Sequence, residues 1–221
     1  MTSRTTLGIP FLASIVFVAV VLALPVDAVK PLEPAVKRDL PLPTLLAAAA
    51  NDINGFWQWA FNSTGRAYAP PQMVAYTGQI NTPCGVLQSN NAAYCQAAHT
   101  IYYDYNFINR SYTNVGDYAA VGIIAHEWGH VVQAHLGISR GNSYSIQMEL
   151  QADCFMGAYT KYAERTGKLE PGDLDEAGED LFKSGDPKGM PWFASQAHGS
   201  PLQRVGAFLD GYNERPCFPR R

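Results

Sequence analysis

The sequence predicts an α+β domain that is mainly helical, with a small β-sheet ahead of a central helix. Apolar residues recur at helical spacing from Thr44 to Asn62 and again through the run GDYAAVGIIAHEWGHVVQAHLG, which ends at Gly137. Between these segments, Met73 to Tyr76 and Thr100 to Tyr105 are β-rich runs bounded by turn residues, which predicts two strands. The segment NTPCGVLQSNNAAYCQAAH between the strands is expected to be a polar loop.

Three further helices are expected after the central one. The first begins near Ser143, a suitable N-cap, and carries the stretch SIQMELQADCFMGAY. The second runs from Asp173 to about Lys183, and its acidic residues are interpreted as a solvated face; a calcium site is the alternative, although the EF-hand spacing is absent. The last has Ser200 as N-cap and Pro201 at its first position, and continues through Leu209. Its core-facing residues are predicted to be Val205, Phe208 and Leu209.

The N-terminal stretch is set apart from this domain. Arg4 precedes an uncharged apolar run from Leu7 to Leu24, and Val26-Asp27-Ala28 offers small residues suited to cleavage. We therefore expect residues 1–28 to be a signal peptide. The apolar run is also nearly long enough to span a bilayer, so an uncleaved anchor over residues 7–26 is the alternative. Either form predicts an exported domain, secreted or held in the cell envelope.

Residues 29–43 are proline-rich and lack apolar periodicity, which predicts a linker. The remaining residues, 44–221, are numerous enough for one domain with a proper core. The formal net charge is −3 and no basic block is present, which argues against nucleic acid as a partner. Contact with a membrane is expected only through the N-terminal segment, if it is not cleaved.

The central helix carries the pattern H-E-x-x-H. His126 and His130 are four residues apart, so their imidazoles share one helix face and can reach the same ion. Glu127 is rotated about 100° from His126, which places it beside such an ion as a base and not as a ligand. This arrangement is typical of zinc peptidases. The alternative is a pair of hydrogen-bonded histidines on a buried structural helix.

A catalytic zinc site needs a third protein ligand, and the next helix offers one. Glu149 and Asp153 are four residues apart and share a face among apolar neighbours, where unpaired carboxylates would be costly. Glu149 is predicted to bind the metal. Asp153 is predicted to accept the remaining N–H of a ligand histidine and to fix its tautomer. Cys154 as the third ligand is a rival assignment, but it leaves both carboxylates unexplained.

The segments HEWGHVVQ and ELQADCFMGAY together resemble the bacterial putative neutral zinc metallopeptidase family, a branch of the gluzincins. The similarity runs from about Trp57 to Phe218 and includes FWQWAFNSTGRAYAPP and SQAHGSPLQRVGAFLDGY. The resemblance implies a zincin-like domain that holds one Zn²⁺ per chain. It also implies His126, His130 and Glu149 as zinc ligands, Glu127 as general base and Asp153 as a supporting partner.

The resemblance extends to the cysteines and to the cleft. Four cysteines in an exported chain suggest two disulfides with three possible connectivities, and the resemblance favours Cys84–Cys95 with Cys154–Cys217. It implies that the strand TIYYDYNF, with Tyr102, Tyr103 and Asp104, borders the cleft and pairs through its free edge with an extended peptide. It also implies that a residue near the start of the last helix hydrogen-bonds the oxyanion, and His198 is the candidate for that role.

Other polar residues have weaker assignments. Arg204 is a secondary candidate for substrate binding or for structural pairing, and His99 and His135 are interpreted as structural because they match no ligand spacing.

Taken together, the residues predict an exported zinc metallopeptidase that hydrolyses peptide bonds in an extended peptide or protein substrate. Two alternatives remain open at the level of sequence. One is a zinc-stabilised cell-envelope protein that binds a partner without catalysis. The other is a zinc amidase that acts on cell-wall peptides.

Overall fold

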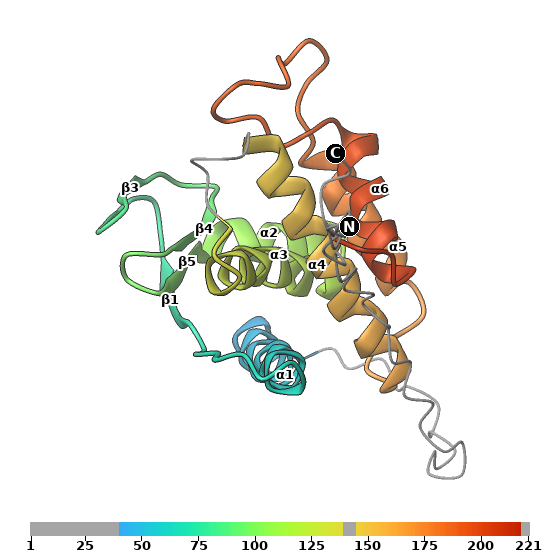
Figure 1. The fold of residues 1–221 in the computed structure, drawn as a ribbon. Helices are drawn as coiled ribbons and strands as arrows, with labels where there is room; N and C mark the ends of the chain where they lie inside the picture. The colour runs from blue at the N-terminus through green and yellow to red at the C-terminus, as the bar shows by residue number, and fades with distance from the viewer. Residues whose placement is uncertain (1–39, 139–144, 218–221) are drawn as a thin grey trace, which may run out of the picture. The chain divides into compact units, whose positions relative to one another are not determined.

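The structure is a computed structural model that describes residues 40–138 and 145–217. Residues 1–39, which hold the expected signal peptide and most of the expected linker, lie outside the described residues, as does Ser143. Within the described ranges, no helix combines the length and the apolar character needed to cross a membrane. The domain is α+β and mainly helical, as predicted, and its elements can be followed in Figure 1. In chain order they are α1 (Leu42–Ser63), β1 (Gln72–Tyr76), β2 (Ile80–Thr82), β3 (Gly85–Leu87), β4 (Ala92–Cys95), β5 (Thr100–Asp104), α2 (Tyr105–Asn114), α3 (Asp117–His135), α4 (Ser145–Arg165), α5 (Asp173–Lys183) and α6 (Pro201–Tyr212).

The main sheet has three strands in the order β1-β5-β4. Strand β5 is central: β1 pairs with it in parallel, with Gln72 opposite Thr100, and β4 pairs with it antiparallel, with Cys95 opposite the same residue. The strands β2 and β3 form a separate antiparallel pair. The expected polar loop between β1 and β5 is therefore wrong in part, because it contains three short strands.

Strand β5 ends one residue earlier than predicted because Asp104 caps a helix. Its Oδ1 atom accepts a hydrogen bond from the Asn106 backbone N–H at 3.0 Å, which satisfies a donor at the start of α2. Tyr105 consequently begins the helix and does not continue the strand. This helix was not predicted.

The core forms around α3, which is buried along nearly its whole length from Tyr118 to Gln133. The apolar stripe of α1, including Ile53 and Trp57, belongs to the same core cluster. On another side α3 packs against α4, which in turn packs against α6. The crossing of α4 and α6 is very close, because a Cβ added at Gly211 would lie 1.8 Å from the Cys154 carbonyl oxygen.

The last two helices follow the prediction closely, with differences in what they bury. On α5, Asp173 is only 5% exposed, so the acidic face is not solvated throughout. Helix α6 begins at a capping box in which Ser200 and Gln203 satisfy each other's backbone donors. Phe208 is buried as expected, but Leu209 is 44% exposed, because the face that packs inward contains Arg204, Phe208 and Gly211.

Candidate metal centre

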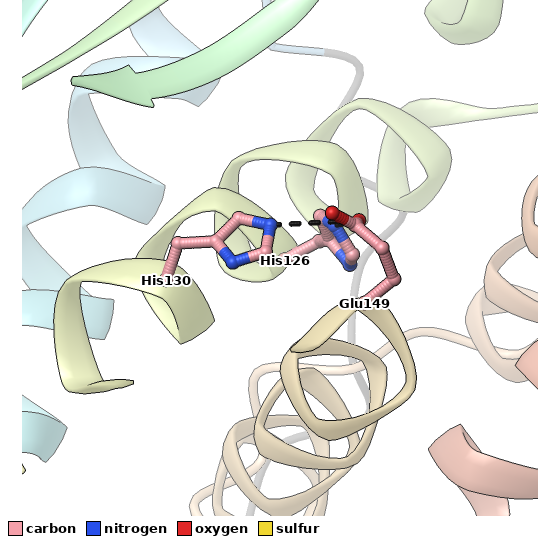
Figure 2. Close-up of side chains that lie close together, drawn as sticks. All are labelled: His126, His130 and Glu149. Atoms are coloured by element: carbon pink, nitrogen blue, oxygen red, sulfur yellow. Dashed lines mark hydrogen bonds and ion pairs between the residues drawn. The ribbon is translucent and has the colours of Figure 1, made fainter. Parts of the chain in front are cut away.

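Helices α3 and α4 bring together the three predicted ligands. Figure 2 shows the imidazoles of His126 and His130 meeting the carboxylate of Glu149. The Oε2 atom of Glu149 lies 3.2 Å from His126 Nε2 and 3.5 Å from His130 Nε2. One donor atom from each residue falls within 4.8 Å of the other two, close enough to share an ion. The two rings are nearly perpendicular, at 89°, so each directs a nitrogen to the same point from a different side.

Gly129 allows the two helices to approach this closely. It lies between the histidines in the motif, and a Cβ built there would be 2.8 Å from Ala152 Cα on α4. Real Cβ contacts are not that short, so any larger residue would push α4 away. The packing of α3 against α4 therefore limits the size of the residue at the second variable position of the motif, and this residue has no role in holding a metal.

Asp153 supports His126 from behind. Its Oδ1 atom is 2.7 Å from His126 Nδ1, and the side chain is completely buried. Arg204 on α6 binds the same carboxylate twice, with Nε 2.9 Å from Oδ2 and Nη2 2.7 Å from Oδ1. Arg204 also donates to the Ser184 hydroxyl at 2.7 Å. The contacts of Arg204 are therefore those of a structural ion pair, one of the two roles left open for it.

The protonation equilibria of the cluster are strongly displaced. Burial lowers the pKa of His126, but Asp153 and the hydrogen bond that the ring donates to Glu149 outweigh burial and raise the pKa to about 10. Burial also lowers the pKa of His130, yet the Glu149 charge raises it overall. Burial raises the pKa of Glu149, and the two histidines hold it well below its ordinary range. The cluster thus favours positive charge between its donors, as protons or as a cation.

Two imidazoles and one carboxylate are the ligand set of many catalytic zinc sites. Each imidazole already has its Nδ1 atom in a hydrogen bond to another residue, Asp153 or Gln133, which leaves Nε2 for an ion. The residues present therefore fit zinc. Metal binding itself stays a prediction.

Glu127 lies beside this cluster and is 6% exposed. Its Oε2 atom accepts a hydrogen bond of 2.8 Å from the backbone N–H of Tyr94 on β4. Together with the three candidate ligands, Glu127 lines a cavity of about 660 Å³. Its carboxylate is thus held at the point where the sheet edge, the cluster and the cavity meet.

The chain resembles known proteins over most of its length. Residues 35–216 match the model of the family described as putative neutral zinc metallopeptidase. The chain belongs to this family. The match begins further upstream than the resemblance predicted from sequence, and it covers every helix and strand described.

The chain is also similar to two uncharacterized bacterial proteins. The chain is 35% identical over 181 residues to YpfJ of Escherichia coli, across 71% of this chain and 63% of YpfJ. It is 31% identical over 196 residues to Rv2575 of Mycobacterium tuberculosis, across 76% of this chain and 66% of Rv2575. The chain therefore matches less than two thirds of the length of either relative. No solved structure matches it significantly.

One prediction drawn from the family is wrong. The strand with Tyr102, Tyr103 and Asp104 has no free edge, because β5 is paired with β1 on one side and β4 on the other. The outer strand beside the metal cluster is β4. The resemblance was applied to β5 because this was the strand predicted ahead of the metal helix, whereas the four-residue β4 was expected to be part of a loop.

His198 remains a prediction. It lines the same cavity as Glu127, but its side chain is 51% exposed. Its backbone N–H donates to Asp186 Oδ2 at 2.8 Å, and its Nδ1 atom lies 3.6 Å from Asp186 Oδ1. The position is compatible with an approach to a substrate in the cavity.

The two remaining histidines of the domain have structural contacts, as predicted. His99 Nδ1 is 2.8 Å from the Tyr94 hydroxyl and His99 Nε2 is 3.0 Å from the Ala69 carbonyl oxygen. His135 Nε2 is also 3.0 Å from the Ala69 oxygen.

Both disulfides have the connectivity that the resemblance favoured, Cys84–Cys95 and Cys154–Cys217. Pairing of Cys154 also removes its thiolate as a rival zinc ligand.

Sequence reasoning missed Gln133 and Tyr94. Gln133 lies three residues after His130 on the same helix face, and this spacing could have identified it as a partner. No sequence pattern could have shown that the Tyr94 backbone binds Glu127.

Proposed function

We propose that this protein is an exported zinc metallopeptidase that hydrolyses peptide bonds, with Glu127 as the general base. The observation that carries this proposal is the convergence of His126, His130 and Glu149 beside a buried carboxylate that is not one of the three. A purely structural metal site has no need of a base at that position. Family membership supports the same chemistry.

His126, His130 and Glu149 would hold the zinc ion. When bound, zinc supplies a Lewis acid that polarises a carbonyl and brings the pKa of water toward about 7. Glu127 takes a proton from the attacking water and delivers it to the leaving amine. The Tyr94 N–H keeps the Glu127 carboxylate oriented for both transfers. His198, on the cavity wall, donates to the carbonyl oxygen as that atom gains negative charge.

The substrate is an extended segment of peptide or protein that adds to the outer side of β4. In an antiparallel pair, alternate residues direct their backbone groups toward the partner strand. The Tyr94 N–H binds Glu127 and therefore points away from β5, so the backbone groups of Ala92 point the same way. A peptide lying there would be hydrogen-bonded to β4 in the same cavity as the candidate base.

Export is part of the proposal. The two disulfides are compatible with an oxidising compartment, where such bonds persist. The apolar N-terminal run would direct the chain there.

The test compares wild type with Glu127→Gln, and uses Glu179→Gln on the exposed face of α5 as the matched control. Zinc content is measured by elemental analysis and cleavage by digestion of a peptide library. We expect Glu127→Gln to retain zinc while its cleavage rate falls by about 10²–10⁴-fold, the usual contribution of general base catalysis. Glu179→Gln should match wild type.

A zinc-loaded Glu127→Gln variant with full activity would remove Glu127 from this role. Zinc-loaded wild type that cleaves no peptide, casein or wall fragment would support the non-catalytic alternative, and cleavage of wall fragments alone would support the amidase.

A further inference from the structure

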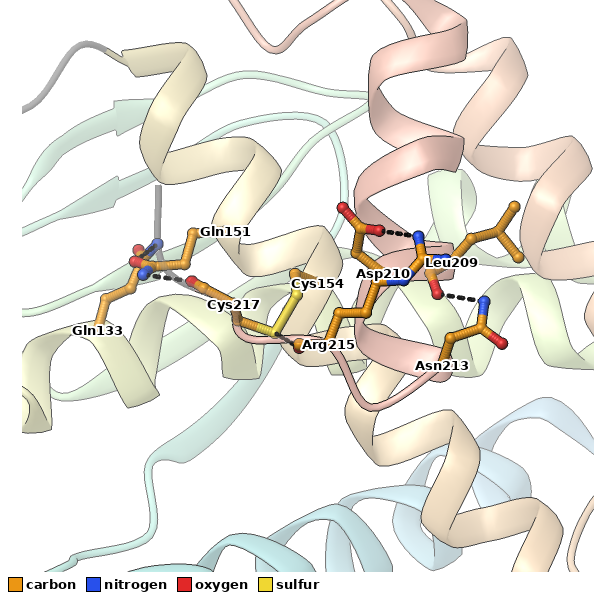
Figure 3. The surroundings of a disulfide bond; sticks show 8 residues. All are labelled: Gln133, Gln151, Cys154, Leu209, Asp210, Asn213, Arg215 and Cys217. Atoms are coloured by element: carbon orange, nitrogen blue, oxygen red, sulfur yellow. Dashed lines mark hydrogen bonds and ion pairs between the residues drawn. A yellow bond between two sulfur atoms is a disulfide. The ribbon is translucent and has the colours of Figure 1, made fainter. Parts of the chain in front are cut away.

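A buried chain of hydrogen bonds runs away from His130 on the side opposite the candidate metal site. His130 Nδ1 is 2.9 Å from Gln133 Oε1, and Gln133 Nε2 is 3.0 Å from Gln151 Oε1. Gln151 Nε2 in turn donates to the Cys217 carbonyl oxygen at 2.8 Å. Figure 3 shows the two glutamines and Cys217 in sequence, next to the disulfide. Both glutamines are almost completely buried, at 1% and 6% exposure.

The direction of every hydrogen bond in this chain is fixed by backbone carbonyl groups. A carbonyl oxygen can only accept, so the Cys217 oxygen requires the NH₂ group of Gln151. Gln151 must then present its own oxygen to Gln133. Independently, the Met148 carbonyl lies 2.7 Å from Gln133 Nε2 and requires an NH₂ group there too. Two separate acceptors therefore assign the same orientation to Gln133.

This orientation determines the tautomer of His130. With its NH₂ group bound to acceptors, Gln133 presents Oε1 to His130 Nδ1 and can only accept from it. The Nδ1 atom must carry the hydrogen. In the neutral ring, the Nε2 atom then has its lone pair free, and this is the atom that faces Glu149.

The end of the hydrogen-bond chain that lies away from His130 is held by a disulfide. Cys217 lies beyond the end of α6 and is joined to Cys154 on α4 by the disulfide. Cys154 directly follows Asp153, the residue that supports the other histidine. The disulfide thus holds the Cys217 carbonyl at a fixed place relative to the helix that carries Glu149.

We infer that Gln133 and Gln151 are positioning residues for zinc binding, which hold His130 in the metal-binding tautomer through a chain that ends at the Cys217 carbonyl. The inference rests on the proposed zinc site. The two histidines are supported differently. His126 is held by a charged carboxylate, whereas His130 is held by a neutral amide whose orientation is fixed by backbone carbonyl groups.

The test uses Gln133→Met and Gln151→Met, which keep the length of the side chain and remove the amide. Gln58→Met, on the exposed side of α1, is the matched control. Zinc affinity is measured by competition with a chromophoric chelator, and the stability of the metal-free proteins by urea unfolding. We expect Gln133→Met to weaken zinc binding about 10-fold, at the lower end of the range for such partners. Gln151→Met, one step further away, should weaken it less, and Gln58→Met should leave it unchanged.

The two measurements separate a positioning role from a structural one. If the glutamines only stabilise the fold, both methionine variants will unfold at lower urea concentration yet bind zinc as tightly as wild type, which overturns the inference. Should Gln133→Met fail to fold, the zinc affinity of Gln151→Met decides the question. Wild type that binds no zinc would refute the proposed function instead, so the two failures are distinguishable.

Discussion

Replacement of Arg204 by methionine tests the energetics of the buried ion pair behind His126. Methionine preserves much of the side-chain volume but removes both hydrogen bonds to Asp153, at 2.9 Å and 2.7 Å, and those to Ser184. Asp153 has no solvent exposure and would keep His126 as its remaining charged partner. Loss of one member of a buried ion pair usually costs about 3–5 kcal/mol. Because His126 still binds Oδ1, we expect the lower end, about 3 kcal/mol.

The assay is urea unfolding of the disulfide-bonded protein in the presence of a chelator, so that metal binding does not contribute. Arg165→Met is the control, because Arg165 makes a similar contact with Glu214 in which the two side chains are 59% and 56% exposed. Such exposed pairs contribute less than about 1 kcal/mol. The double variant Arg204→Met with Asp153→Asn should be more stable than Arg204→Met alone, because it removes the buried carboxylate that has lost its Arg204 partner. The reasoning is wrong if Arg204→Met costs no more than Arg165→Met, or if the double variant is the less stable of the two.

Two further predictions concern packing and pH. Gly129→Ala should lower the free energy of unfolding by about 2 kcal/mol and also weaken zinc binding, because the added methyl group would overlap Ala152. A variant with the stability of wild type in urea unfolding and the zinc affinity of wild type in chelator competition would contradict this prediction. Burial raises the pKa of the Asp173 carboxyl from 3.8 to about 6, and nearby acidic residues add to this rise. The folded protein therefore favours the protonated carboxyl, and the stability that this protonation contributes is complete below pH 3.8 and is lost as the pH rises through about 6. Asp173→Asn should therefore be more stable than wild type at pH 8, by at most about 3 kcal/mol at 1.36 kcal/mol per pKa unit, and no more stable at pH 3.5; an equal difference at both pH values in urea unfolding would contradict the shift.

Local patterns predicted most of the helical part of the fold. The shared face of His126 and His130, and that of Glu149 and Asp153, depends only on helix periodicity, which is visible in a single sequence. The start of α6 was equally predictable, because Ser200 followed by Pro201 describes the cap directly.

The sheet was less predictable because strand pairing depends on residues far apart in sequence. Nothing in Ala92-Ala93-Tyr94-Cys95 indicates an edge strand, and the position of β4 is decided by its pairing with β5. Leu209 was misassigned for a similar reason. Its apolar character suggested burial, but the inward face of α6 is set by the close approach of Gly211 to α4.

At the candidate metal site, too, local sequence patterns predicted some residues, and others depend on the tertiary structure. The candidate ligands were predictable, whereas the groups that orient them come partly from the backbone. The roles of Gln133 and Gln151 depend on the Met148 and Cys217 carbonyl groups, whose positions require the tertiary structure.

If Glu127 is the general base, as proposed, its hydrogen bond with Tyr94 has a consequence for the order of events during catalysis. A peptide that joins β4 adds a neighbour to a four-residue strand whose backbone already holds the base. Docking would therefore restrain the strand and, through it, the carboxylate, so that occupancy of the cleft and alignment of the proton acceptor are coupled. Short peptides unable to reach Ala92 would lose turnover rate as well as affinity.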